Sequence, residues 1–415
     1  MAKKQSIGGL LYKKYVGTDG YKMYKECNLL VITLNYSSYV KDPVDLICNN
    51  FNYVNVFVRH NPIAEISNYI PINYLKPHRL KYLIDYTTKP DNLTVFPTSV
   101  PYIPIDMWHK RLGDQNFRVV NARINKNKLK FDLIHSHFIW TPGYVGVKLK
   151  EKYNVPLIIT GHGFDVYNLP FIDDEWTKKI EEVLNHADIV ITVSRRNAQY
   201  LQKLKIQTPV KVIPNGFKRE LFYRMDQERT KEILRLPRNK KIIFTAGHLK
   251  PMKGHRFLVE AMSTIIKDKK DILCLIAGSG SQKNNLQRLI KKLNVQDYIK
   301  LVGEKTHSEI PLWINACDLF VLPSLNEGNP TVLFEALGCG KPFIGTNVGG
   351  IPEIIISDEY GFLCKPGDPE DLAEKILIAL DKKWDYENIV KYSERYTWNN
   401  IVKKILEVYS KVLGK

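Results

Sequence analysis

The chain alternates short, largely apolar runs with longer segments whose apolar residues have helical spacing. Such runs, bounded by Gly, Pro or polar residues, are typical of strands that are buried on both faces of a parallel sheet. They lie at residues 28–34, 55–59, 93–96, 131–138, 155–160, 189–194, 242–246, 272–277, 299–302, 319–322 and 343–346. The alternation predicts an α/β protein with parallel sheets.

The stretch 320–353, FVLPSLNEGNPTVLFEALGCGKPFIGTNVGGIPE, indicates a strand, a loop, a helix, a second strand and a second loop. Pro330 stands where a helix would begin, because a missing N–H costs nothing there. An anion at this helix start would meet the free backbone N–H groups of Thr331, Val332 and Leu333 and the positive end of the helix dipole. The sequence therefore predicts a phosphate site at residue 331.

Two carboxylates, Glu327 in the loop and Glu335 in the helix, stand on either side of this helix start. They cannot bind a phosphate, but they can accept hydrogen bonds from hydroxyl groups on either side of one. A nucleotide sugar, with its ribose, diphosphate and hexose, has this arrangement. The alternative at this point is two solvated glutamates around an ordinary turn between a strand and a helix.

Glu327 and Glu335, with seven residues between them, followed by GCGKP and VGGIPE, resemble the E-x7-E signature of the family 4 glycosyltransferases. The resemblance implies the GT-B fold, in which two Rossmann-like domains face each other across a cleft. It also implies a retaining, metal-independent enzyme in which Glu327 contacts the hydroxyls of the donor sugar and Glu335 holds the ribose. Gly328 and Asn329, in the same loop, are expected to bind substrate as well.

Two further turns match the family in part. Thr160 and His162 correspond to its T-x-H turn, which implies that His162 contacts the donor sugar and serves catalysis. In GHLKPMKG, Lys253 corresponds to the lysine that grips the diphosphate, whereas His248 stands in the place of an arginine. Because histidine lacks the permanent bidentate fork of arginine, one phosphate contact is expected to be weaker, and Lys250 is an alternative donor.

Gly278 and Gly303 end two strands of the second half and are expected to lie beside the nucleotide. The fingerprint of dinucleotide-binding proteins lacks its third glycine after residue 280, so NAD is not expected. His135 and His137 point the same way from one strand, but a metal site needs a third ligand and no such motif is visible. We therefore expect packing at the seam between the domains, no metal and no cofactor beyond the donor sugar.

The chain has 415 residues with a formal net charge of +18, and its lysines are spread along its whole length. A basic surface suits anionic substrates, an anionic membrane or nucleic acid. Trp108, His109, Lys110 and Arg111, with the basic stretch 126–130, suggest a peripheral position at the inner face of the membrane, with a soluble enzyme as the alternative. No run is apolar enough to cross a bilayer, and six scattered cysteines indicate buried thiols in a reducing, cytoplasmic compartment.

These observations predict an acceptor-side domain at residues 1–222, a nucleotide-sugar domain at 223–395 and a C-terminal helix at 396–415. The family resemblance implies that this helix returns to the first domain. A mixed-charge linker at 218–240 contains the seam. The expected reaction moves a hexose from a nucleotide-diphosphate sugar to a hydroxyl of a glycan, a lipid-linked acceptor or a small molecule. An epimerase of the same architecture and a basic nucleic-acid-binding protein are the alternatives, although no nucleic-acid partner is expected.

Overall fold

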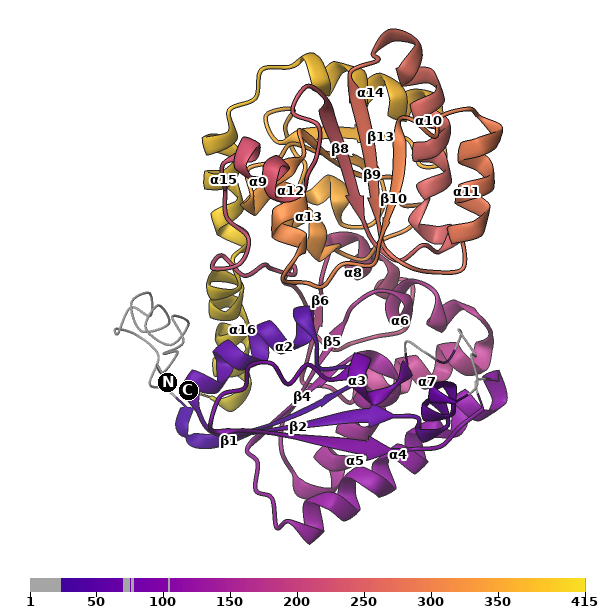
Figure 1. Cartoon of the computed structure of the whole chain (residues 1–415). Coiled ribbons are helices and arrows are strands. Elements are labelled where there is room, and N and C mark those ends of the chain that lie inside the picture. Colours follow the sequence, from indigo (N-terminus) through magenta and orange to yellow (C-terminus); the bar gives the residue numbers. More distant parts are fainter. Residues whose placement is uncertain (1–23, 70–74, 76–77, 104, 415) are drawn as a thin grey trace, which may run out of the picture.

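The computed structural model describes residues 24–69, 75, 78–103 and 105–414, so the unassigned segment at 1–26 lies almost wholly outside the described residues. Two parallel sheets form the centres of two halves, and helices cover their faces (Figure 1). The first sheet has the order β3-β2-β1-β4-β5-β6-β7. Its strands are β1 (Tyr24–Thr33), β2 (Phe51–His60), β3 (Leu93–Ser99), β4 (Leu133–His137), β5 (Leu157–Gly161), β6 (Ile189–Thr192) and β7 (Val210–Val212).

The second sheet has the order β10-β9-β8-β11-β12-β13. Its strands are β8 (Lys241–Ala246), β9 (Ile272–Ala277), β10 (Ile299–Gly303), β11 (Leu319–Leu322), β12 (Phe343–Thr346) and β13 (Gly361–Cys364). In both sheets the neighbouring strands pair in parallel throughout. The predicted architecture of two Rossmann-like α/β halves is confirmed; the boundaries at residues 222 and 395 stay predictions.

Helices connect the strands of each half. In the first half they are α2 (Ser38–Ile47), α3 (Leu80–Leu83), α4 (Asp106–Lys126), α5 (Tyr144–Tyr153), α6 (Phe164–Tyr167), α7 (Asp174–Asn185) and α8 (Arg195–Leu201). In the second they are α9 (Gln227–Ile233), α10 (His255–Asp268), α11 (Lys283–Lys292), α12 (Ile310–Ala316), α13 (Thr331–Gly338), α14 (Pro369–Asp381) and α15 (Tyr386–Ser393), before the final helix α16 (Trp398–Leu413).

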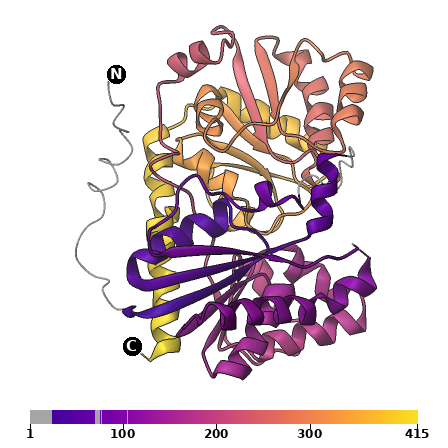
Figure 2. The ribbon, with the colours of Figure 1, turned by 60° about the horizontal axis from the view of Figure 1, so that its bottom comes forward.

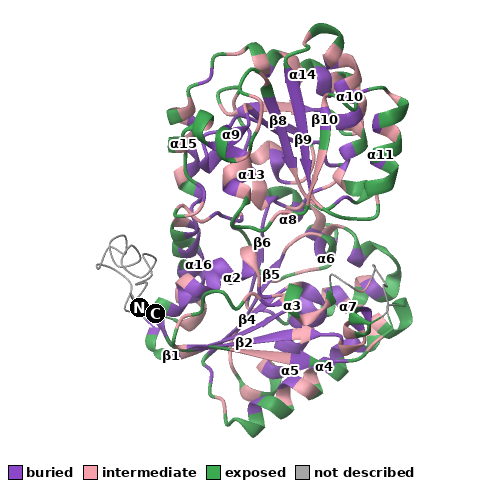
Figure 3. Cartoon of the chain, viewed as in Figure 1, coloured by how far each residue is buried: buried purple, intermediate pink, exposed green. Residues whose placement is uncertain are grey.

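The apolar runs became strands because helices on both faces remove their side chains from water. Every residue of β4, β5, β6, β9, β11 and β12 is buried. Figure 3 shows this in the purple strands of both halves, whereas green, exposed residues lie mostly on helices and loops. The six cysteines are free and buried, as the sequence predicts.

The segment 218–240 is more than the linker that its mixed charge predicted. Residues 227–233 form helix α9, whose N-terminus is capped by Asp226, since its carboxylate accepts a hydrogen bond from the N–H of Arg229 at 2.7 Å. Thr230 and Lys231 on this helix are buried, and α9 packs against α12. Packing against other elements of the second half stabilises this short charged helix, although its sequence has no clear apolar periodicity.

Helix α16 leaves the second half and lies along the first. Figure 2 shows it as the yellow helix beside the indigo strands. Its buried face packs on α2, and the hydroxyl of Tyr409 lies 2.7 Å from Nδ1 of His135 inside the first half. The two connections between the halves run side by side, because the N–H of Phe217 donates to the carbonyl of Tyr396 at 3.1 Å and the N–H of Trp398 donates to the carbonyl of Phe217 at 3.0 Å.

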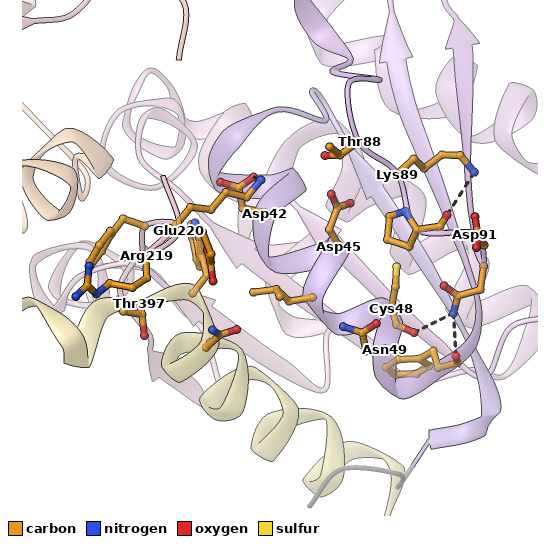
Figure 4. A pocket seen from close by; sticks show the side chains of 18 of the residues that line it. Asp42, Asp45, Cys48, Asn49, Thr88, Lys89, Asp91, Arg219, Glu220 and Thr397 are labelled. Carbon is orange, nitrogen blue, oxygen red and sulfur yellow. Dashed lines mark hydrogen bonds and ion pairs between the residues drawn. The ribbon is translucent and has the colours of Figure 1, made fainter. Parts of the chain in front are cut away.

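A cavity of about 760 Å³ lies beside these connections, between α2, the loop before β3 and the start of α16. Figure 4 shows Asp42 and Asp45 of α2 on one side of it and Arg219 and Glu220 on the other. None of the predicted site residues lines this cavity.

Candidate active site

Lys253 and Glu327 meet at the carboxyl ends of the central strands β8 and β11. Nζ of Lys253 lies 2.6 Å from Oε1 of Glu327, and the hydroxyl of Ser324 donates to the same oxygen at 2.7 Å. Gly254 places the lysine here, because it adopts a left-handed conformation (φ +65°) in which an added Cβ would lie 1.9 Å from the carbonyl oxygen of Pro323. The structure thus brings together two residues that the sequence assigned to the phosphate and to the sugar.

The start of α13 offers fewer free donors than the sequence predicted. The N–H of Leu333 donates to the carbonyl of Pro330 at 3.2 Å, and the Leu333 side chain is in the core. The prediction that this N–H is free is therefore wrong, because the first turn of the helix closes on its own N-cap residue. The N–H groups of Thr331 and Val332 have no hydrogen bond within the described chain, and both residues are partly exposed. An anion at α13 would meet these two.

Glu335 is almost fully buried and is held by a residue that the sequence did not identify. Nε2 of His307 lies 3.2 Å from Oε1 of Glu335. Burial lowers the pKa of His307, but the hydrogen bond and charge of Glu335, with the more distant Asp42, outweigh it and raise the pKa above its ordinary value. Asp42 forms an ion pair with Lys218 at 2.7 Å, so this network joins α2 of the first half to the ribose carboxylate predicted in the second.

His162 follows β5 and lies among aromatic rings. Its Nε2 is 3.1 Å from Nδ1 of His137, and the two imidazoles stack at 5.3 Å. Burial, followed by the proximity of His137, lowers the pKa of His162 far below its ordinary value, so the ring is neutral at pH 7. Its buried Nδ1 has no partner in the described part of the chain. A neutral imidazole with one open nitrogen can bond to a sugar hydroxyl.

The turn that carries His162 is held by Asp165, which the sequence analysis did not single out. The carboxylate of Asp165 accepts hydrogen bonds from the N–H groups of Gly163 at 2.8 Å, Ile139 at 3.0 Å and His162 at 3.2 Å. Tyr39 packs edge-on against the His162 ring at 5.1 Å. Tyr39 lies in the first turn of α2, which follows β1.

His135 takes the structural role that the sequence favoured over metal binding. Its Nε2 lies 2.7 Å from the hydroxyl of Thr160 and its Nδ1 contacts Tyr409, so both ring nitrogens are used in packing. His135 and His137 stack at 4.3 Å, which confirms that they point the same way. Within the described residues, no three His, Cys, Asp or Glu side chains are arranged to hold a metal ion.

His248 and Lys250 precede Lys253 in the loop after β8. Partial burial of the ring lowers the pKa of His248, and Lys250 and Lys253 lower it further. His248 is therefore neutral at pH 7 and does not supply the charge of the arginine that the family has here. Gly278 packs on the carbonyl of Gly247, whereas an added Cβ on Gly303 would meet nothing within 4 Å. This leaves open space beside the carboxyl end of β10.

The loop after β11 also touches the first half directly. An added Cβ on Gly328 would lie 2.3 Å from the carbonyl oxygen of His162, so only glycine fits this approach. Asn329 pairs with Asn215: its side-chain oxygen accepts from the N–H of Asn215 and its carbonyl from the amide group of Asn215, both at 2.8 Å. The carboxylate of Glu353 accepts from the N–H groups of Arg195 and Arg196. The two halves are in contact around the candidate site.

Residues 108–111 do not form one basic surface, although Trp108 and Arg111 are exposed. The ammonium group of Lys110 lies 2.7 Å from Asp173, 3.0 Å from Glu175 and 3.2 Å from Asp106. The ring of His109 packs on Trp176 at 5.3 Å. The expectation that Lys110 is available to an anionic surface is wrong, because three carboxylates from two helices surround it.

Two parallel α/β halves that meet at a glycine-rich loop, beside the Lys253–Glu327 ion pair, have the architecture of the GT-B fold. The family model for group 1 glycosyl transferases matches residues 226–396, and that for glycosyltransferase family 4 matches residues 77–221. An uncharacterized glycosyltransferase of Methanocaldococcus jannaschii is 30% identical over 303 residues, which cover 71% of this chain and 80% of the relative. The chain belongs to the family 4 glycosyltransferases.

Solved structures give the same fold. Sucrose-phosphate synthase of Thermosynechococcus elongatus is similar with a TM-score of 0.77 at 21% identity, covering 94% of this chain and 99% of that one. HepE of Anabaena, in complex with UDP, is similar with a TM-score of 0.71 at 19% identity, covering 92% and 100%. The predicted GT-B fold and enzyme class are confirmed. Within the described residues, no helix is both long and apolar enough to cross a membrane.

Proposed function

We propose that this glycosyltransferase moves a hexose from a nucleotide-diphosphate sugar to a hydroxyl acceptor, with retention of the anomeric configuration and without a metal ion. The observation that carries the proposal is the Lys253–Glu327 pair, which lies beside the contact of Gly328 with the turn of His162. A cation for the phosphates and a carboxylate for the sugar thus stand together where the two halves meet. HepE, which shares the fold, binds UDP, so UDP-sugars are the first donors to test.

The chemistry follows from the charges around the leaving group. When a donor binds, Lys253 would turn from Glu327 to the diphosphate, and the N–H groups of Thr331 and Val332 would face it. These donors would stabilise the negative charge that develops as the glycosidic bond to the diphosphate breaks. The leaving phosphate oxygen would take the proton of the acceptor hydroxyl on the same face of the sugar. Glu327 and His162 would orient the hexose, and Glu335 the ribose.

Calorimetry with UDP-, GDP- and ADP-hexoses should identify one preferred donor. With that donor we expect full turnover in EDTA and a product whose anomeric configuration, read by NMR coupling constants, equals that of the donor. Glu327→Gln keeps the shape and removes the charge, so turnover should fall more than nucleotide affinity. An inverted product, or loss of activity in EDTA that manganese restores, would reject the mechanism.

For the acceptor we propose a hydroxyl of a glycan, of a lipid-linked intermediate or of a small molecule, reached at the cytoplasmic face of the membrane. Support for the membrane comes from apolar side chains that stand exposed at the start of α4: Ile103, Ile105, Met107 and Trp108. Because Lys110 is neutralised, apolar insertion would contribute more than charge. Trp108→Ala should reduce co-sedimentation with anionic liposomes, whereas a protein that stays in the supernatant at low salt would exclude the membrane.

A further inference from the structure

Arg59 is a cation at the carboxyl edge of the first sheet that the donor chemistry does not use. It is the penultimate residue of β2, and the parallel strands β4 and β5 deliver His137 and His162 to the same edge. In parallel α/β sheets, ligands bind at this edge. Its position therefore places Arg59 on the side of the cleft that faces the acceptor.

The guanidinium of Arg59 lacks a carboxylate partner in the described part of the chain. One of its nitrogens donates to the hydroxyl of Thr141 at 3.5 Å, and its Cζ lies 5.0 Å from the ring centroid of Tyr102. Burial lowers the pKa of Arg59 below its ordinary value, with only the nearby Tyr102 opposing this. A partly buried charge is less well solvated than one in water and has no counterion here, so the site is suited to receive an anion.

Burial and the charge of Arg59 lower the pKa of two nearby histidines, His78 and His109. Burial lowers the pKa of His78, and Lys250 from the second half and Arg59 from the first lower it further. His78 is thus within electrostatic reach of cations from both halves. Figure 2 shows the purple stretch after β2 reaching up to the orange half. Burial and then Arg59 lower the pKa of His109 to about 4, against a smaller opposite effect of Asp106.

Two buried polar side chains, Thr141 and Asn116, lie next to the guanidinium. The hydroxyl oxygen of Thr141 accepts hydrogen bonds from Arg59 and from the amide group of Asn116, the latter at 3.2 Å, so its own proton is left to donate. The side-chain oxygen of Asn116 is buried and has no partner in the described residues. Because both side chains are buried, Thr141 positions the guanidinium, and a ligand would meet Arg59 itself.

We propose that Arg59, positioned by Thr141, binds an oxyanion carried by the acceptor, so that the acceptor is a phosphorylated or carboxylated hydroxy compound. The inference rests on the proposed transfer, because it gives the acceptor side of the same cleft its chemical class. It is distinct from the donor diphosphate, which the pair of Lys253 and Glu327 and the start of α13 would receive. A guanidinium binds phosphate or carboxylate through two parallel N–H groups.

A calorimetric titration with inorganic phosphate, made with and without saturating UDP, tests the site directly. We expect the wild-type protein to bind phosphate in both conditions and Arg59→Gln to bind it at least about tenfold more weakly, since a charge-assisted hydrogen bond is lost. Arg111→Gln, which removes an exposed arginine of α4, is the matched control and should bind as the wild type does. No phosphate binding, or equal binding by Arg59→Gln and wild type, overturns the proposal.

UDP affinity separates this proposal from the proposed function. Arg59→Gln should bind UDP as tightly as the wild type; a matching loss of UDP affinity would assign Arg59 to the donor and overturn the acceptor site. If the wild type binds no nucleotide, the proposed function fails while the phosphate titration still reports on Arg59. If Arg59→Gln does not fold, Arg59→Lys decides, because lysine keeps the charge without the bidentate fork and should weaken phosphate binding.

Competition against bound phosphate distinguishes the two sources of the oxyanion. Glucose 6-phosphate, glucuronate and glucose share a pyranose ring and differ in their charge. Displacement by glucose 6-phosphate alone indicates a phosphorylated acceptor, and displacement by glucuronate as well indicates a site for either anion. Displacement by glucose as effectively as by the charged sugars would mean that the oxyanion is not what the site recognises, and would overturn the proposal.

Discussion

Lys253 and Glu327 are 74 residues apart in the chain, yet Nζ of the lysine lies 2.6 Å from Oε1 of the glutamate. The pair forms because the left-handed Gly254 packs against the carbonyl of Pro323, which ends β11 and begins the loop of Glu327. Glu327 is almost fully buried, so the lysine compensates a carboxylate that water reaches poorly. A bound diphosphate would therefore compete with Glu327 for the same ammonium group.

Removing that ammonium group should weaken nucleotide binding. We expect Lys253→Ala to lose about 2 to 5 kcal/mol of binding free energy, as when one partner of a buried charge contact is deleted. Glu335→Ala should also weaken binding through the ribose. Calorimetric titration with the preferred nucleotide measures both, and Lys267→Ala, an exposed lysine of α10, is the control. Unchanged affinity in both variants would refute the assignment of these residues to the donor.

Gly328 should not tolerate a side chain. Gly328→Ala places a Cβ 2.3 Å from the carbonyl oxygen of His162, so the two halves must separate there or the loop must shift. We expect lower turnover and a lower melting temperature. Gly247→Ala is the matched control for stability, because its added Cβ meets nothing within 4 Å. Equal melting temperatures and turnover for Gly328→Ala and wild type would show that the contact is dispensable.

The Glu335–His307 contact should make stability depend on pH above neutrality. Because the pKa of His307 is raised in the folded protein, its contribution is fully present below the unfolded pKa of about 6.5 and is lost as the pH rises through the raised value. The His307 ring is partly exposed, so we expect less than about 1 kcal/mol. Denaturant unfolding of wild type and His307→Gln should differ more at pH 6 than at pH 9; a constant difference would contradict the pairing.

The buried histidines beside the site should make the folded protein less stable at acid pH, in contrast to the Glu335–His307 contact, whose stabilisation is lost at alkaline pH. Burial lowers the pKa of His137 to about 3, so this group is neutral in the fold and binds a proton first in the unfolded chain. Stability is therefore lost as the pH falls below about 6.5, by up to about 1.4 kcal/mol per pH unit for this histidine. The free energy of unfolding of His137→Gln should fall less steeply between pH 6.5 and 5 than that of wild type.

His186→Gln is the control for that measurement, because His186 is an exposed histidine at the end of α7. Its unfolding should follow the wild-type slope. A slope for His137→Gln that equals the wild-type slope would mean that the His137–His162 pair does not oppose protonation of the folded state.

The sequence by itself determined the strands and the turns that follow them. Runs such as LFVL at 319–322 form strands in any fold that buries both faces, and Pro330 starts α13 through a local constraint on its own backbone. The spacing of Glu327 and Glu335 was likewise visible, because both belong to one loop and its helix. Periodicity and turn chemistry act over a few residues, and a single sequence displays them directly.

Only the tertiary structure decided which side chains form ion pairs and hydrogen bonds with each other. His307 holds Glu335 from 28 residues away, Asn215 pairs with Asn329, and Lys110 is surrounded by carboxylates, although nothing local marks any of these contacts. The N–H of Leu333, which the sequence predicted to be free, donates a hydrogen bond to the N-cap residue of its own helix. Such pairings depend on how two sheets and their connections pack, and their distances and dehydration, which set their energies, arise only when the chain has folded.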